Sequence, residues 1–143
     1  MSQVSKDAGS PPEAGEGVAM GRFVILEHNW DGVHWDLMLE RGEVLRTWAI
    51  DAPIVAGVEL PARALADHRR LYLEYEGPIS GARGTVRRVE EGRYDVLHWA
   101  PERVVVRLAG VQLVGEVELR RFSSKEGAPP LRSSWTFRLG NFD

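Results

Sequence analysis

The stretch that decides the fold is residues 23–50, FVILEHNWDGVHWDLMLERGEVLRTWAI. It begins with a short apolar run, residues 23–26, that is rich in strand-forming side chains. From residue 33 to residue 39 the odd-numbered residues are apolar, and the even-numbered ones are His34, Asp36 and Met38. The two sets face opposite sides of a strand. A third strand over residues 44–50 is expected after a turn at Arg41-Gly42, so the stretch predicts antiparallel β-structure.

The rest of the chain continues this pattern. Further strands are predicted over residues 72–75, 85–89, 94–99, 104–108, 117–122 and 135–139, with Gly92, Pro101, Gly110 and Gly115 between them. Residues 61–70 are expected to form two or three helical turns beginning at Pro61. Seven or eight short strands with one short helix predict a mainly β fold, an antiparallel barrel or sandwich, of which the barrel is preferred.

The domain organisation expected from the sequence is simple. Residues 1–20 are small, polar and rich in Gly and Pro, which predicts a disordered N-terminal tail. Residues 21–143 are expected to form one β-barrel domain, and residues from Ser123 a loop before the last strand. We find no internal repeat and no second domain.

The composition excludes several classes of protein. The chain has no cysteine, which removes disulfides, thiolate metal sites and cysteine nucleophiles, and suits the cytoplasm. We find no signal peptide and no apolar stretch of about 18 residues, so no membrane association is expected. The net charge is −3, but residues 63–88 carry six arginines against three acidic residues. This segment is either a phosphate-binding face or an ordinary solvated one.

Two of the four histidines lie in one predicted hairpin beside an aspartate. A two-residue turn at Asp31-Gly32 would place His28 on the wrong face, whereas a three-residue loop over residues 30–32 pairs His28 with His34. Their Cβ atoms would then lie about 4.5–5.5 Å apart, with Asp36 next along the same face. Two imidazoles and a carboxylate suit Mn²⁺, Zn²⁺ or Fe²⁺.

Less specific interpretations of these residues remain open. The spacing of His28, His34 and Asp36 is not a selective pattern, and one histidine could pack in the core while the others lie on the surface. If the apolar face of the strand packs on the core, the polar face lines either solvent or a cavity. His68 and Tyr72 would share one side of the predicted helix, either as phosphate-handling groups or as part of an ordinary amphipathic turn.

Taken together, these segments resemble the 3′-phosphoesterase domain family of bacterial ATP-dependent DNA ligase D. That family has an apolar strand ending in His, then His-x-Asp-x-Arg, then Gly-Val-Leu-x-Ser-Trp-Ala. The corresponding segments here are residues 23–28 (FVILEH), 34–40 (HWDLMLE) and 42–49 (GEVLRTWA). The family segments Glu-Asp-His-Pro-Leu-x-Tyr and Phe-Glu-Gly-x-Ile-Pro-x-Gly resemble residues 66–72 and 75–81, and a late family tryptophan resembles Trp135.

The resemblance implies an antiparallel barrel that binds manganese through His28, His34 and Asp36. It also implies that His68 and Tyr72 line the phosphate site and, with Asp36, carry out catalysis. Such enzymes act on the 3′ ends of DNA primer strands, from which they remove a terminal ribonucleoside and then a 3′-phosphate. Nucleic-acid 3′ ends, and separate ligase or polymerase proteins, are therefore the expected partners of a monomer.

The sequence also departs from the family pattern. Met38 stands where the family has an arginine that clamps phosphate, and methionine has neither a charge nor a donor. Leu26 and Ala66 replace a glutamine and a glutamate. Because the polymerase and ligase domains are missing, we expect a divergent, stand-alone member.

Another arginine could replace the missing clamp. We expect Arg69 and Arg70, beside His68, to bind phosphate. Arg63 and Arg83 are further candidates. Three functions stay open: a metal-dependent phosphoesterase, a binding module that keeps the fold and the metal, and a barrel for an unrelated small ligand.

The composition of the N-terminal segment generates a first test. Deleting residues 1–20 should leave the melting temperature unchanged, because a segment without periodic apolar residues has little to pack with. Thermal unfolding followed by circular dichroism measures this. A decrease of several degrees, equivalent to about 1 kcal/mol for a domain of this size, would show that the segment packs on the barrel.

Overall fold

The structure is a computed structural model, and it describes residues 20–122 and 134–140. The expected loop from Ser123 and residues 1–19 of the expected tail lie outside the described residues. Met20, assigned to the tail in the sequence analysis, is instead the first residue of a strand. In the described part of the chain, no helix has the length and apolar character needed to cross a membrane.

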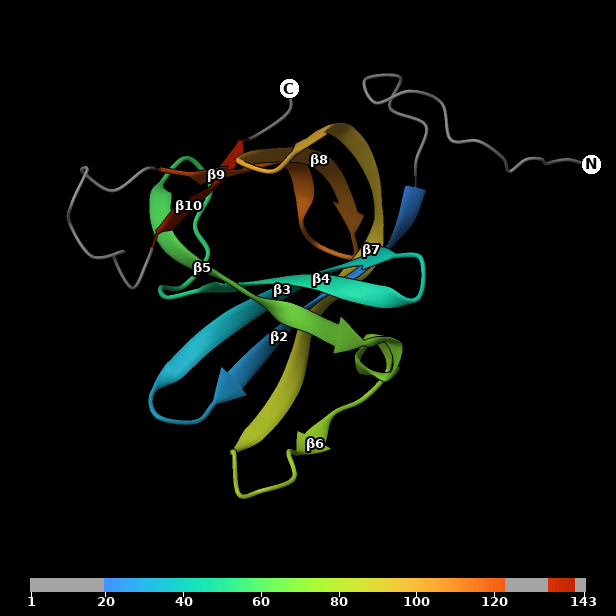
Figure 1. Ribbon diagram of the computed structural model, residues 1–143, viewed down its shortest axis with the longest axis vertical. Coiled ribbons are helices and arrows are strands. Elements are labelled where there is room, and N and C mark those ends of the chain that lie inside the picture. Colours follow the sequence, from blue (N-terminus) through green and yellow to red (C-terminus); the bar gives the residue numbers. More distant parts are fainter. Residues whose placement is uncertain (1–19, 123–133, 141–143) are drawn as a thin grey trace, which may run out of the picture.

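The described residues form a closed antiparallel barrel, which confirms the fold class expected from the sequence. The order around the barrel is β2-β3-β4-β5-β10-β9-β8-β7, and β7 pairs back with β2 to close it (Figure 1). The short strand β6 pairs with the outer part of β7. The elements are β2 (Met20–Asn29), β3 (Val33–Arg41), β4 (Val44–Ile50), β5 (Glu59–Arg69), the 3-10 helix η1 (Arg70–Leu73), β6 (Gly77–Pro78), β7 (Thr85–Ala100), β8 (Arg103–Gly110), β9 (Val114–Arg121) and β10 (Trp135–Gly140).

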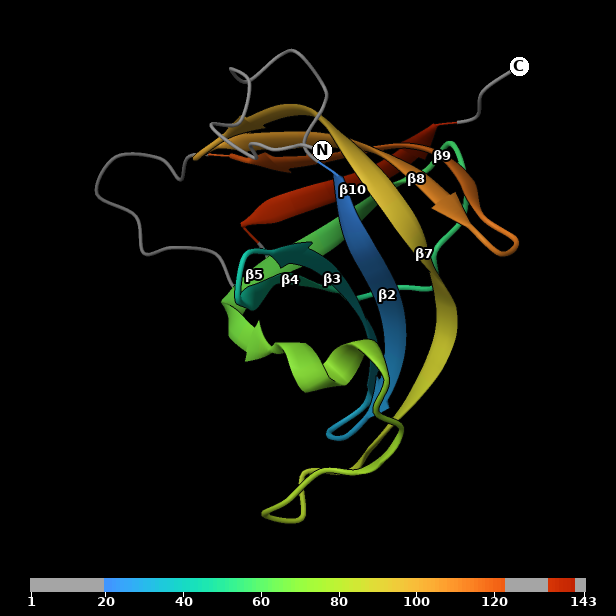
Figure 2. The same ribbon diagram turned by 90° about the vertical axis from the view of Figure 1, so that its right-hand side faces the viewer.

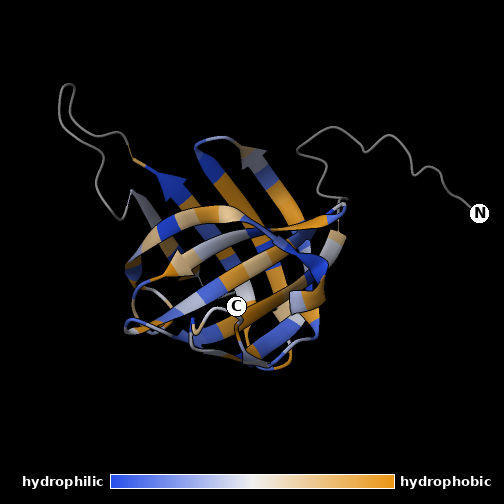
Figure 3. Cartoon of the chain, turned by 60° about the horizontal axis from the view of Figure 1, so that its bottom comes forward, coloured by the Kyte–Doolittle hydropathy of each residue, from blue (hydrophilic) through white to orange (hydrophobic). Residues whose placement is uncertain are grey.

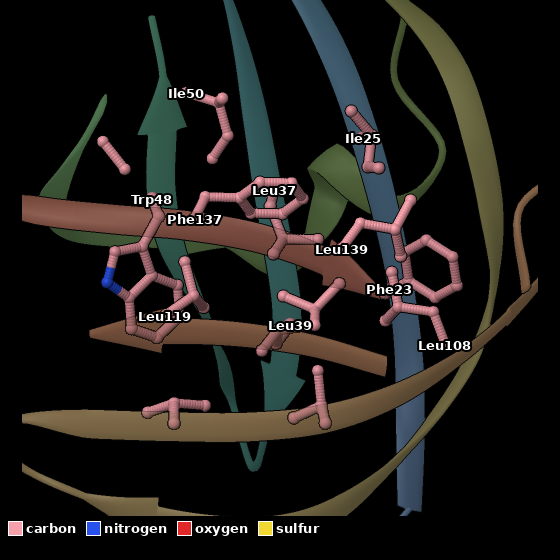
Figure 4. Packing of buried hydrophobic residues seen from close by; sticks show 14 of the residues in the cluster. Phe23, Ile25, Leu37, Leu39, Trp48, Ile50, Leu108, Leu119, Phe137 and Leu139 are labelled. Atoms are coloured by element: carbon pink, nitrogen blue, oxygen red, sulfur yellow. The ribbon is translucent and has the colours of Figure 1, made fainter. Parts of the chain in front are cut away.

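The barrel is filled by the apolar sides of its strands. Polar and apolar residues alternate along most strands (Figure 3), so each strand sends one set of side chains inward. Figure 4 shows side chains from several strands meeting in this interior, among them Trp48 and Phe137. The fully enclosed members include Leu37, Leu39, Trp48, Leu108, Leu119 and Phe137. Burying side chains of this size contributes roughly 1.5–3 kcal/mol each and holds the strands in register.

A second, smaller apolar cluster lies on the opposite face of β2, β3 and β4. Its buried members are Val24, Leu26, Met38, Leu45, Leu73 and Val86, with Tyr72, Tyr75 and Ile79 packed against them. The helix η1 lies against β2 (Figure 2). It carries the buried Leu73 into this cluster. Strand β3 is therefore covered on both faces, unlike an ordinary barrel strand whose outer face meets water.

Two expectations about residues 61–75 are wrong. Residues 61–69 lie in β5 rather than in a helix. Residues 72–75 are not a strand, since η1 spans Arg70–Leu73. The Ala-Arg-Ala-Leu stretch favours helix locally, but Leu60 and Ala62 alternate into the barrel core and β5 pairs with both β4 and β10. Tertiary pairing outweighs a local preference of a few tenths of a kcal/mol per residue.

The segments expected as separate strands over residues 85–89 and 94–99 form one continuous strand, β7. Gly92, interpreted as a break, lies inside it. A Cβ there would approach the Ala109 carbonyl oxygen to 2.1 Å, so the glycine permits close contact with β8 rather than a turn. The N-terminal half of β7 pairs with β2, and its first two residues also pair with β6. The C-terminal half pairs with β8 and, at its start, also with β2. This strand therefore links the barrel to the region beneath η1.

Glu90 on β7 is a buried carboxylate that the sequence did not reveal. Its two oxygens accept hydrogen bonds from the backbone N–H groups of Glu91, Val111, Gln112 and Leu113, at 2.6–3.0 Å. Three of these donors lie in the connection between β8 and β9. The carboxylate therefore fixes that connection against the barrel through charge-assisted hydrogen bonds to its backbone.

We expect Glu90→Ala to lower the free energy of unfolding by about 2 kcal/mol, because the substitution removes part-buried hydrogen bonds from backbone N–H groups to a charged carboxylate. Chemical denaturation measures the change. The matched control is Glu102→Ala, which removes an exposed carboxylate from the β7–β8 turn and should change stability by less than about 0.5 kcal/mol. Equal effects of the two substitutions would contradict this role for Glu90.

Candidate metal and phosphate site

The site begins with the register of the β2–β3 hairpin. His28 pairs with His34 and Asn29 with Val33, which leaves residues 30–32 as a three-residue loop. Asp31 and Gly32 adopt positive φ angles of 55° and 94°, and this left-handed backbone closes the loop. The predicted pairing is confirmed, and it places His28, His34 and Asp36 on one face of the hairpin.

The three side chains converge. The His34 Nε2 atom lies 3.1 Å from Asp36 Oδ1, and the His28 Nδ1 atom lies 3.7 Å from Asp36 Oδ2. One nitrogen or oxygen from each residue lies within 4.8 Å of the other two, a spacing at which one ion can bind all three. Asp36 is buried with 3% of its side chain exposed, whereas the histidines keep 14–15% exposed and reach the surface.

Two details of the contacts fit a metal ion better than a hydrogen-bonded cluster. Asp36 Oδ1 is buried and has no hydrogen-bond partner among the described residues, although His34 Nε2 is only 3.1 Å away. Two ligand atoms bound to one ion at about 2.0–2.2 Å are themselves roughly 3–3.5 Å apart. In addition, His28 Nε2 donates to the Arg83 carbonyl at 2.8 Å, which leaves the Nδ1 lone pair facing Asp36. A ring nitrogen held by a backbone carbonyl is the usual arrangement behind a metal-binding histidine.

The electrostatics of the cluster also favour a cation. Burial raises the pKa of the Asp36 carboxyl, but His28 and His34 outweigh burial and hold its pKa below the ordinary value. The Asp36 carboxylate in turn raises the pKa of His28, against the lowering effect of burial. A buried carboxylate that keeps its charge needs a positive partner, which a proton on His28 or a bound metal ion supplies.

A pocket of about 160 Å³ opens beside the cluster and contains His28, Asp36, Met38, His68 and Tyr72 in its lining. The His68 and Tyr72 rings lie 5.8 Å apart, as the sequence predicted, although His68 is on β5 and Tyr72 on η1. His68 Nδ1 donates to the Ala66 carbonyl at 2.8 Å, which leaves Nε2 for another partner. Met38 is 1% exposed and belongs to the apolar cluster beneath the pocket.

Of the four arginines proposed as phosphate-binding candidates, Arg63, Arg69 and Arg70 lie outside the pocket. Arg70 forms an ion pair with Glu40, and Arg63 forms a bidentate pair with Asp51 at 2.8–3.2 Å. Arg69 is exposed and does not line the pocket. Arg83, in the loop between β6 and β7, is the arginine that does line it.

Two residues that the sequence did not predict, Trp30 and Gly84, shape the pocket together with Arg83. Trp30 lies at its edge with its ring stacked near His28, at 6.2 Å between centroids. Arg83 lines the pocket, and its carbonyl holds His28. Gly84 has a φ of +78°, and a Cβ there would lie 2.0 Å from the Asn29 carbonyl oxygen, so glycine lets the two loops touch. The glycine-rich composition of residues 77–84 was the available signal, and it indicated only a turn.

A larger hollow of about 540 Å³ lies away from these groups. Its lining is mostly apolar, with Ile25, Trp35, Ile54, Leu113 and Leu139 among its residues. Its one titratable lining residue, Glu90, already accepts hydrogen bonds from four backbone N–H groups. The groups capable of chemistry are therefore in the smaller pocket.

Comparison with known proteins agrees with this geometry. The family described as "DNA Ligase D 3'-phosphoesterase domain" matches residues 26–121. Two curated relatives are the "Multifunctional non-homologous end joining protein LigD" of Mycobacterium bovis and the "Multifunctional non-homologous end joining DNA repair protein LigD" of Mycobacterium tuberculosis. Each is 34% identical over 119 residues, which is 77% of this chain and 15% of the relative, so the chain spans about 15% of the length of these proteins. The match covers the hairpin, the pocket and most of the barrel, and the chain belongs to the DNA ligase D 3′-phosphoesterase domain family.

Proposed function

We propose that this protein is a metal-dependent phosphoesterase that acts on the 3′ ends of nucleic acid. The observation that carries the proposal is the convergence of two imidazoles and a buried carboxylate beside a pocket that also contains His68 and Tyr72. The family membership supports it, since the relatives are named as end-joining proteins. The expected substrates are a 3′-phosphate or a 3′-terminal ribonucleoside on DNA.

The residues that would hold the ion are His28 through Nδ1, His34 through Nε2 and Asp36 through its carboxylate. We propose Mn²⁺ or another divalent transition metal, because mixed nitrogen and oxygen ligands with open positions suit these ions. The chemistry that such an ion supplies is polarisation of a phosphoryl oxygen and activation of a water molecule. Removal of a 3′-phosphate then adds the water oxygen to phosphorus, breaks the bond to the 3′ oxygen and leaves inorganic phosphate and a 3′-hydroxyl.

His68 and Tyr72, which line the same pocket, would act on the phosphoryl group. With Nδ1 engaged by the Ala66 carbonyl, a protonated His68 presents Nε2–H, which can hold a phosphoryl oxygen or deliver the proton that the 3′ oxygen needs. The Tyr72 hydroxyl can donate a second hydrogen bond to the phosphoryl group. Both residues are half-buried, so they are partly shielded from water while remaining accessible to a chain end.

The wider biological role follows the same family. We propose that the protein takes part in DNA repair by end joining, in the cytoplasm, as a monomer that prepares 3′ ends for separate ligase or polymerase proteins. A clean 3′-hydroxyl is what those enzymes require.

A binding module is the second candidate, and Met38 is the observation that favours it. A buried methionine stands where the resemblance expects a phosphate-clamping arginine. A module of this kind would bind the metal and a nucleic-acid end without turnover. The barrel for an unrelated apolar ligand has less support, because the one titratable residue in the lining of the larger hollow, Glu90, already accepts hydrogen bonds from backbone N–H groups.

The central test uses a primer–template with a 3′-phosphate or a 3′-ribonucleotide, with and without Mn²⁺. His34→Ala should lower the rate by more than about 100-fold, since even the partners of metal ligands cost about 10- to 100-fold when removed. His98→Ala is the matched control, because His98 is exposed on β7 and lies outside the pocket. It should retain wild-type activity. If the wild-type protein binds Mn²⁺ and DNA but releases no phosphate, the phosphoesterase proposal is wrong and the binding module is supported.

A second test separates the roles of the two histidine types. We expect His68→Ala to lower kcat by about 10²- to 10⁴-fold, because a positioned proton donor or acceptor is lost. The dissociation constant for Mn²⁺, measured by isothermal titration calorimetry, should change by less than about two-fold, since a metal ligand would change it far more. Loss of metal binding in His68→Ala would show that His68 is a ligand instead.

A further inference from the structure

A phosphate substrate needs a permanently charged donor, which His68, Tyr72, Met38 and Asp36 do not supply. A phosphate monoester carries close to two negative charges near neutral pH, and its recognition commonly relies on a guanidinium that donates two parallel hydrogen bonds. Met38, at the floor of the pocket, has no donor, and Asp36 adds a negative charge of its own. His68 and Tyr72 can donate hydrogen bonds, but neither carries the permanent charge of an arginine.

We propose that Arg83 is the phosphate clamp of this protein and does from the β6–β7 loop what an arginine at position 38 would do from β3. The inference rests on the proposed function and names the cationic residue of the same site. Arg83 is not part of the motifs that carry the family resemblance. The sequence offered it only as one of four candidate arginines, and the pocket distinguishes it from the other three.

The backbone places Arg83 firmly beside the metal-type cluster. Its carbonyl accepts a hydrogen bond from His28 Nε2 at 2.8 Å, so the residue is attached to a proposed metal ligand. The loop that carries it is closed by a hydrogen bond from Ile79 N to the Gly84 carbonyl at 2.8 Å. Gly84 then packs against the tip of the β2–β3 hairpin, at Asn29 and Trp30. These contacts fix the start of the side chain at the rim of the pocket.

The guanidinium of Arg83 keeps its charge available. Its Nε donates to the Ser80 carbonyl at 2.7 Å, and Nη2 lies 3.2 Å from Ser80 Oγ, both neutral acceptors. Among the described residues, no carboxylate lies within ion-pair distance of it. Arg63 and Arg70, in contrast, are each paired with a carboxylate. An arginine has five N–H donors, so the two contacts with Ser80 orient the group and leave donors for a phosphoryl oxygen.

The experiment measures binding of inorganic phosphate to the full-length, Mn²⁺-loaded protein by isothermal titration calorimetry. We expect Arg83→Ala to weaken phosphate binding by about 10- to 100-fold, the effect of losing one or two charge-assisted hydrogen bonds. Arg83→Lys should lie between the wild type and Arg83→Ala, because lysine keeps the charge without the fork. Affinity for Mn²⁺ should stay within about two-fold of wild type, because substitution leaves the backbone carbonyl that holds His28 in place.

Arg87→Ala is the matched control. It removes an exposed arginine four positions along the chain, one whose side chain pairs with Glu27 and does not line the pocket. It should change phosphate affinity by less than about three-fold, as expected for a screened surface charge. Melting temperatures of all variants confirm that each is folded.

The outcomes separate this inference from the proposed function. Wild-type phosphate affinity in Arg83→Ala, equal losses in Arg83→Ala and Arg87→Ala, or no phosphate binding by the wild type would each overturn the clamp. A wild type that binds phosphate through Arg83 but does not hydrolyse a 3′-phosphate would refute the proposed function and leave the clamp standing. If the protein hydrolyses a 3′-phosphate and Arg83→Ala does not change the rate, the clamp is refuted and the proposed function stands.

Discussion

The rest of the structure depends on the pairing of His28 with His34 across the β2–β3 hairpin. Side chains alternate along a strand, so a register shift of one residue would turn every side chain of β3 to the opposite face. Leu37 would then leave the barrel interior and Asp36 would enter it. The left-handed loop over residues 30–32 fixes the register, and with it both the apolar core on one side of β3 and the ionisable cluster on the other.

Strand β3 is enclosed on both faces, and this explains the character of the cluster. The cover formed by η1 and the β6–β7 loop keeps Asp36 away from bulk water. The attraction between a carboxylate and a cation is stronger in this less polar environment than in water. The same cover needs an apolar floor, which Met38 supplies by packing with Leu26 and Leu45. A guanidinium at that depth would require partners of its own. Strand β3 therefore supplies the apolar floor of the pocket through Met38, and the β6–β7 loop supplies the charge at its rim through Arg83.

Local features of the fold could be predicted from the sequence, and long-range ones could not. The hairpin register follows from loop length and alternation within a dozen residues. The closeness of His68 and Tyr72 was predicted for the wrong reason, because β5 was interpreted as a helix. Its pairing with β10 joins segments more than 70 residues apart, which no local pattern records. Arg83 reaches His28 across 55 residues for the same reason, so only the folded chain brings them together. The proposed metal ligands are local, and the rim of the pocket is not.

The hydrogen bond between His28 and the Arg83 carbonyl has a consequence for how two ligands would bind together. The His28 imidazole faces Asp36, a proposed metal ligand, through Nδ1 and bonds to the β6–β7 loop through Nε2. If a bound metal ion stabilises the ordered loop by a given free energy, then a second ligand that orders the loop must strengthen metal binding by the same free energy. The coupling is reciprocal and passes through a single ring. A nucleic-acid end resting on the loop would therefore help to retain the ion.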